Sequence, residues 1–280
     1  MNVTLPDNKL DKKAKIVYIS IIAICIISII LVIYAQFFEG RTVTTVGNLK
    51  GKSDASYEVL KSEFDGLFTN NLQKTDETYN NQKEDSSKEL VYTGYTNKQN
   101  EENNYNIDVN IPYINIKNTT IKKYNEEIKS VFESKAEEIL KTKNKNSIYT
   151  VEYSSYIQDG ILSLVIRANL KEGSNTQRVI IKTYNYSLEE NKEVDLKYIL
   201  NMEKVEESYA QNKIDEEIKN EQKKSDDLKA LGYTIYERNT NDSSYKIENI
   251  NEFYFHDGSI YVIFAYGNDK FTSEVDIAII

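Results

Sequence analysis

The chain has 280 residues, a net charge of −9 at pH 7, and 22 tyrosines but no tryptophan. With one histidine and one cysteine it lacks the usual zinc ligands and cannot form a disulfide within the chain. Its acidity disfavours nucleic acid as a partner. We expect neither a metal ion nor any other cofactor, and an ordinary apolar core must stabilise the folded part.

An uncharged apolar run extends over residues 16–38. Its 23 residues are long enough, as a helix, to span the ~30 Å hydrocarbon core of a bilayer. The alternative is a cleaved signal peptide, but its apolar region is usually ~7–15 residues long, and no small-x-small cleavage site follows. Ile24 precedes Cys25, where bacterial lipidation needs a small residue. We predict an uncleaved signal anchor that crosses the cell membrane once.

Basic residues flank this run unequally. Four lysines lie in residues 1–15, whereas three basic residues follow within residues 41–52. Because the more cationic flank stays inside, residues 1–15 are predicted to be a short cytoplasmic tail and residues 39–280 to be extracytoplasmic. The tail also carries two aspartates, so the whole-chain charge of −9 leaves −11 on the exterior part. That charge serves solubility, and it would speed encounter with a basic envelope protein or cationic cell-wall component.

Residues 39–104 are predicted to connect the membrane to a folded domain. Residues 39–54 have the glycine and serine content of a short stalk. A juxtamembrane helix is expected next, because five apolar residues share one helical face: Tyr57, Leu60, Phe64, Leu67 and Phe68. Residues 73–104 are polar, which predicts a flexible linker with a short strand at 90–95.

Residues 105–201 are predicted to form the first half of an ectodomain. Alternating apolar residues at 105–111 indicate a strand that Pro112 ends or places at a sheet edge. Apolar residues at helical spacing over 118–140 indicate a helix with Asn118 or its neighbour as the cap.

Two Asp-Gly pairs, Asp159-Gly160 and Asp257-Gly258, each lie between β-rich runs, as in type I′ hairpin turns. After the first hairpin, a third strand and then a fourth, beyond a turn at 190–191, complete an antiparallel meander.

Residues 202–280 are predicted to form the second half of the ectodomain. A helix is expected over 203–231 with Gly232 as its stop, followed by the second hairpin and a final strand. The fold class is therefore α+β, with antiparallel meander and hairpin strands packed on two main helices and preceded by one transmembrane helix.

The only histidine, His256, directly precedes the second Asp-Gly turn. Gln158 holds the matching position before the first turn, so we interpret His256 as a surface residue of a hairpin rather than a catalytic one. The chain shows no nucleophile elbow, phosphate loop or dinucleotide fingerprint. Two carboxylates facing each other across a cleft are the alternative that sequence alone does not reveal. We expect no enzymatic activity.

Two polar loops between strands are the predicted partner-binding sites, because tyrosine and small polar side chains suit binding surfaces. They contain Glu172, Gly173, Ser174 and Asn175 in the first loop, and Tyr266, Asn268 and Asp269 in the second.

The block "YTVEYSSYIQDGILSLVIRANLKEGSNTQRVIIKTYNYSLEENKEVDLKYIL", followed by a helix, "FYFHDGSIYVIF" and "YAYGNDKFTSEVDIAII", resembles the RsiV-type extracytoplasmic domain. The resemblance covers about residues 105–280, and the nearest forms are uncharacterised clostridial membrane proteins. That domain occurs in lysozyme-sensing anti-sigma factors and in some peptidoglycan deacetylases, so the resemblance implies the fold and a binding role at the envelope.

Three departures limit what the resemblance implies. Many members of the family carry a Gly-Gly-Ala-His loop where this chain has Glu172-Gly173-Ser174-Asn175. Residues 1–15 are too few to fold a sigma-binding domain, and no deacetylase domain is expected after the last strand. Lysozyme is therefore not carried over as the ligand.

The sequence predicts a single-pass membrane protein with a non-catalytic extracytoplasmic recognition domain acting at the bacterial cell envelope. The alternative is a reduced anti-sigma-factor-like sensor of envelope stress, and the third hypothesis is a cell-wall-modifying enzyme.

The predicted topology is testable with a reporter. Alkaline phosphatase fused after Ile280 should be active in intact cells, because the lysine bias exports everything beyond the span. A cytoplasmic reporter at the same position should be inactive, and the opposite pattern would show that the orientation is wrong.

Overall fold

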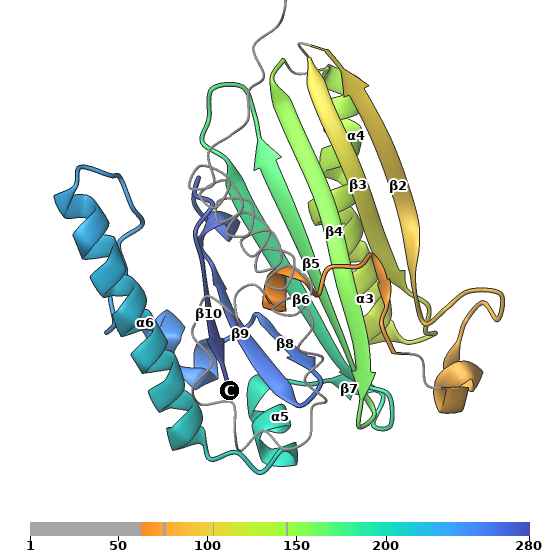
Figure 1. Cartoon of the computed structure of the whole chain (residues 1–280). Helices are drawn as coiled ribbons and strands as arrows, with labels where there is room; N and C mark the ends of the chain where they lie inside the picture. The colour runs from red at the N-terminus through yellow and green to blue at the C-terminus, as the bar shows by residue number, and fades with distance from the viewer. Residues whose placement is uncertain (1–62, 75–76, 103, 144) are drawn as a thin grey trace, which may run out of the picture. The chain divides into compact units, whose positions relative to one another are not determined.

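The computed structural model describes residues 63–280 except 75, 76, 103 and 144 (Figure 1). The predicted cytoplasmic tail, transmembrane span and stalk all lie outside these residues. Within the described residues, no helix combines the length and apolar character needed to cross a bilayer.

The larger sheet has seven strands in the spatial order β2-β3-β4-β5-β6-β7, with β1 paired to β4. Only β3 with β4 and β1 with β4 are parallel, and the other pairs are antiparallel. The strands are β1 (Asn71–Leu72), β2 (Val91–Glu101), β3 (Tyr105–Ile114), β4 (Ser147–Gln158), β5 (Ile161–Lys171), β6 (Arg178–Ser187) and β7 (Lys192–Glu193). The α+β class with antiparallel-rich sheets is confirmed.

A long helix connects β3 to β4 and consists of α3 (Thr119–Ile128), a π-helical turn η4 (Lys129–Glu133) and α4 (Ser134–Thr142). It begins where predicted, because the Asn118 side chain accepts a hydrogen bond of 2.7 Å from Thr120 N. The π turn was not predicted. The helix buries the predicted face, including Ile121, Ile128 and Phe132.

The smaller sheet contains β8 (Phe253–His256), β9 (Ser259–Ala265) and β10 (Val275–Ile279), in the order β10-β9-β8. Two helices precede it, α5 (Leu196–Met202) and α6 (Glu207–Ala230). The helix predicted over 203–231 corresponds to α6, and α5 was not predicted. Gly232 follows α6 with φ of 90°, as expected of a glycine stop. Short 3₁₀ turns complete the described chain: η3 (Glu77–Gln82), η5 (Ser243–Tyr245), η6 (Ile247–Asn249) and η7 (Tyr266–Asn268).

Side-chain alternation stacks these elements in layers (Figure 1). Leu164 and Ile166 of β5 face α3 and α4, whereas Val165 faces the smaller sheet. In β9, Tyr261 faces the larger sheet, whereas Ile260 and Val262, on the opposite face of the strand, pack with α5 and α6. The order is therefore helix, sheet, sheet, helix.

Both predicted hairpin turns are confirmed. Asp159 and Gly160 have φ of 49° and 74°, and Asp257 and Gly258 have φ of 49° and 71°, as a type I′ turn requires. The two turns touch, because Gly258 N donates to Gln158 Oε1 at 2.9 Å.

His256 lies in the predicted hairpin, opposite Ser259, but it is less exposed than a surface residue. It is half-buried, and its ring centroid lies 4.3 Å from that of Tyr156 and 5.7 Å from that of Tyr254. Its Nε2 shares a hydrogen bond of 2.9 Å with Gln73 Oε1. Contacts with β4 and with residues near β1, distant in sequence, cover a side chain that the turn pattern alone places in solvent.

The predicted flexible linker over 73–104 is wrong for its second part. A strand was expected only at 90–95, yet β2 continues to Glu101 and pairs along its whole length with β3. Its polar residues form a strand because cross-strand pairing, rather than burial, supplies the partners.

A buried ion pair fastens α6 to the smaller sheet. Arg238 and Asp276 are 5% and 1% exposed, and two hydrogen bonds of 2.7 Å join the guanidinium to the carboxylate. Arg238 also donates to Ser225 Oγ of α6 at 2.7 Å and to Glu274 Oε2 at 2.8 Å. The charge is thus fully paired, as burial demands.

Stability should depend on the ionisation of Glu217 on α6. Burial, and then the Glu221 carboxylate, raise the pKa of Glu217 from 4.5 to about 7. The folded state therefore prefers the protonated acid, so this side chain reduces stability progressively as pH rises from about 4.5 to about 7. Glu217→Gln should raise the melting temperature above pH 7 and have little effect below pH 4.5 in thermal unfolding. An equal rise in melting temperature below pH 4.5 and above pH 7 would contradict the assignment.

Candidate functional site

The first predicted loop, residues 172–175, lies at the connection between β5 and β6. Glu172 accepts from Lys135 Nζ of α4 at 3.2 Å, whereas Ser174 and Asn175 are exposed. Gly173 adopts φ of 57°, a conformation that glycine tolerates. The structure brings this loop beside the second one, because Thr176 Oγ1 donates to Phe271 O at 2.9 Å.

In the second loop, Tyr266 and Asn268 make internal contacts. Asn268 Nδ2 and Oδ1 bond Ile181 O and N, each at 2.9 Å, and thereby tie the loop to β6. The Tyr266 hydroxyl donates to Asp276 at 2.6 Å, and its ring stacks on Tyr236 with centroids 4.0 Å apart. Only Asp269 among the three is exposed. That either loop binds a partner stays a prediction.

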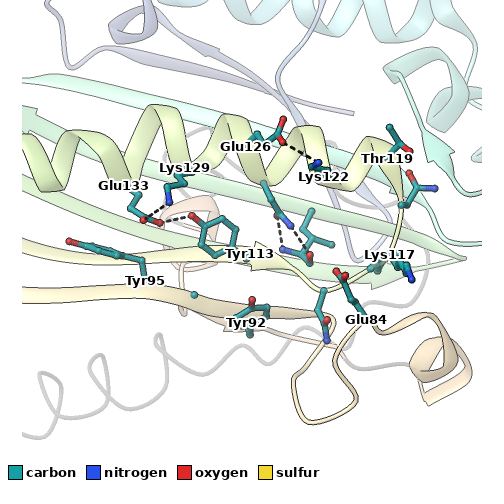
Figure 2. Close-up of a pocket in the computed structure, with 16 residues that line it drawn as sticks. Glu84, Tyr92, Tyr95, Tyr113, Lys117, Thr119, Lys122, Glu126, Lys129 and Glu133 are labelled. Atoms are coloured by element: carbon teal, nitrogen blue, oxygen red, sulfur yellow. Dashed lines mark hydrogen bonds and ion pairs between the residues drawn. The ribbon is translucent and has the colours of Figure 1, made fainter.

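The candidate site is an open groove of about 970 Å³ between the β2–β3 hairpin and the long helix (Figure 2). Tyrosine, amide and charged side chains line it, from β2, β3, α3, η4 and the segments before β2 and after β3. The lining residues are Glu84, Tyr92, Gly94, Tyr95, Tyr113, Ile114, Asn115, Ile116, Lys117, Asn118, Thr119, Lys122, Asn125, Glu126, Lys129 and Glu133.

Three tyrosines on the two strands form the floor of this groove. Tyr92 and Tyr113 are a cross-strand pair, and a register shift at Gly94 inserts one extra residue before Tyr95. Residues three apart on a regular strand face opposite sides, but the bulge returns Tyr95 to the side of Tyr92. Ile114, which also lines the groove, is the last residue of β3.

Gly94 is required by the position of the Tyr113 ring. A Cβ atom built on Gly94 would lie 1.9 Å from Cδ2 of Tyr113, which no side chain tolerates. The backbone of the bulge and the aromatic ring are therefore in direct contact, and the groove owes its floor to a residue without a side chain.

Charged residues at i and i+4 on the helix form the wall of the groove. Lys129 Nζ lies 3.5 Å from the buried Glu133 carboxylate, and Lys122 lies 3.9 Å from Glu126. The Tyr113 hydroxyl donates to Glu133 Oε2 at 2.5 Å (Figure 2). Burial, and then the acceptor Glu133, raise the pKa of Tyr113, so this phenol stays protonated and acts as a donor.

Two asparagines hold the far end of the groove in place. The side-chain amide of Asn125 on α3 accepts a hydrogen bond from Ile114 N and donates one to Ile114 O, each at 2.9 Å. The side-chain amide of Asn115 accepts a hydrogen bond from Asp85 N at 2.9 Å and donates one to Asp85 O at 2.8 Å. Strand, helix and preceding loop are therefore joined by side-chain amides, which makes the groove a pre-formed surface.

The groove is lined by tyrosine, amide and charged side chains, without histidine or cysteine. The chain's only histidine lies elsewhere, at His256, and its only cysteine is Cys25. Within the described residues, no group of three or more histidine, cysteine or acidic side chains is placed to hold a metal ion. The groove instead offers aromatic faces, phenol and amide hydrogen bonds, and paired charges.

Tyr92 and Tyr95 fall in the short strand predicted at 90–95, but that strand was expected inside a flexible linker and no partner strand was predicted for it, so the groove was missed. The one signal that could have found them is the pair of tyrosines around Gly94 in "VYTGYT", since an isolated glycine inside a strand pattern indicates a bulge.

Comparisons with known proteins add little to this description. No family model matches the chain, and no curated protein matches it. Among solved structures, a DUF3298 family protein from Pseudomonas aeruginosa PAO1 is similar at a TM-score of 0.28 and 11% sequence identity. The match covers 35% of this chain and 49% of that one. The resemblance to the RsiV-type domain stays a prediction.

The contact between Gly94 and Tyr113 predicts a specific energetic coupling. Gly94→Ala should destabilise the fold by ~1–3 kcal/mol in denaturant unfolding, because the new methyl group overlaps the ring. In the double variant Gly94→Ala/Tyr113→Ala the clash is absent, so the combined loss should fall short of the sum by about 1 kcal/mol or more. Additive losses would show that the ring does not limit this position.

Proposed function

We propose that the chain is a single-pass membrane protein whose extracytoplasmic domain recognises a protein or cell-wall component at the bacterial envelope without catalysis. The observation that supports this most directly is the pre-formed groove with its floor of Tyr92, Tyr95 and Tyr113. Rigid aromatic side chains with a polar tip supply contact area at low entropic cost, which is why they are enriched in binding sites.

Electrostatics favour a basic partner. The chain carries 44 acidic against 35 basic residues, and the span and tail contribute no negative excess. Long-range attraction would raise the association rate, while contacts in the groove would determine the dissociation rate.

The proposal is tested with the full-length chain in detergent by surface plasmon resonance, with lysozyme as the basic protein and teichoic acid as the acidic wall polymer. Binding to lysozyme should associate more slowly as salt rises from low to physiological, because the Debye length falls from ~30 Å to ~8 Å. Tyr95→Ala should weaken binding about tenfold or more through faster dissociation.

The matched control is Tyr209→Ala, which removes a 53% exposed tyrosine on α6 outside the groove and should leave binding unchanged. Equal effects of the two substitutions would exclude the groove as the site. Tight, salt-insensitive binding to teichoic acid alone would show that the charge preference is wrong.

A further inference from the structure

Among the described residues, strand β2 forms one edge of the larger sheet and pairs with β3 alone. Beyond the bulge at Gly94, its register with β3 is uninterrupted from Tyr95, opposite Ile111, to Glu101, opposite Tyr105. At ~3.4 Å per residue this regular part extends for more than ~20 Å. An unpaired edge of this length is a template for another strand.

The pairing pattern shows which backbone groups of β2 face outward. Ser147 N of β4 donates to Asn104 O at 3.1 Å, so the even-numbered residues of β3 direct their backbone groups toward β4. Their partners in β2 then form non-hydrogen-bonded pairs with β3 and turn their N–H and C=O groups away from the sheet. These partners are Thr96, Lys98 and Asn100.

Apart from the ladder with β3, no hydrogen bond between described residues involves the backbone groups of these three residues. The side chains that usually shield such an edge are also held elsewhere. Lys98 Nζ lies 2.6 Å from Asp108 on β3, and Glu101 lies 3.6 Å from Lys143 at the end of α4. Natural edge strands use projecting lysines against unwanted pairing, but here the lysine points back over the sheet.

The helix side of β2 adds an electrostatic preference. Tyr95 faces this side, and burial, followed by the carboxylates of Glu137 and Glu133, raises the pKa of its phenol. Side chains of a strand added beside β2 would alternate, and those on the helix side would lie next to Tyr95 and these carboxylates. Because Glu133 is already paired with Lys129, lysine or arginine there would meet the carboxylate of Glu137 and the aromatic face of Tyr95.

We propose that the outer edge of β2 takes up an extended segment of a partner protein as an additional strand, with lysine or arginine at alternate positions on the helix side. This rests on the proposed function and names how the partner is held. Main-chain hydrogen bonds to Thr96, Lys98 and Asn100 supply affinity, and the groove beside Tyr95 supplies specificity. A second copy of this acidic chain fits the edge less well, because like charges would face each other.

The test uses the full-length chain in detergent and a fluorescent peptide of about ten residues that alternates lysine with threonine and valine, long enough for the regular edge. Lys98→Pro removes the outward N–H without breaking the ladder to β3, since proline is tolerated on edges at such positions. Binding by fluorescence anisotropy should weaken at least about tenfold. The matched control Lys98→Thr removes the same charge but keeps the N–H, and it should bind as the unchanged chain does.

Hydrogen exchange supplies the second measurement. The peptide should slow exchange at Thr96, Lys98 and Asn100, and it should do so in Lys98→Thr but not in Lys98→Pro, with thermal unfolding showing that both variants fold. A peptide with glutamate in place of lysine should bind at least about tenfold more weakly.

Three results would overturn strand addition: no peptide binding at millimolar concentration, equal binding by the proline and threonine variants, or protection of these amides in the absence of peptide through self-association. Each is distinct from failure of the proposed function, because lysozyme binding that depends on Tyr95 would persist if only strand addition were wrong.

Discussion

The parallel pairing of β3 with β4 constrains everything around it. Two adjacent parallel strands need a crossover, and here the crossover is the helix α3–η4–α4, whose buried side chains pack on β3, β4 and β5. The helix lies behind β3 and β4 (Figure 1), so β2, which is added to β3 by a hairpin, extends beyond its cover. The sheet is wider than the one helix that covers this part of it. The groove beside Tyr95 and the outer edge of β2 both lie where that cover ends.

The same crossover explains why Pro112 is accommodated inside β3 rather than at its end. Pairing with β4 stops at Val109, so the proline lies where β3 has a neighbour only on the β2 side, close to the bulge. β1 pairs with β4 further along, at Ser154 and Ser155. A residue that lacks an N–H thus lies where the ladder is already irregular.

Features set by neighbouring residues were predictable from the sequence. The Asp-Gly turns, the Asn118 cap and the alternation in β3 each depend on a few adjacent side chains. Features set by distant contacts were not. The polar strand β2 exists because β3 pairs with it, and His256 is covered by Tyr156 of β4 and hydrogen-bonded to Gln73.

The candidate site shows the same division. Tyr266 and Tyr95 are the same residue type, yet the first donates a hydrogen bond to Asp276 of β10 and the second lines an open groove. Sequence gives no measure of which tyrosine is packed and which is offered to a partner. In β2 the local signal is Gly94, which precedes Tyr95 at the bulge and whose missing side chain leaves room for the Tyr113 ring.

The Arg238–Asp276 pair also sets an order of events during synthesis. The carboxylate follows the guanidinium by 38 positions, so during synthesis the cation emerges while its counter-charge is still inside the ribosome. Until residues 274–276 arrive, Arg238 stays hydrated, and neither α6 nor the smaller sheet gains its buried anchor. The larger sheet, whose strands lie between residues 71 and 193, meets no such delay. Folding of this domain during synthesis should therefore proceed in two stages, and formation of the ion pair should complete the second.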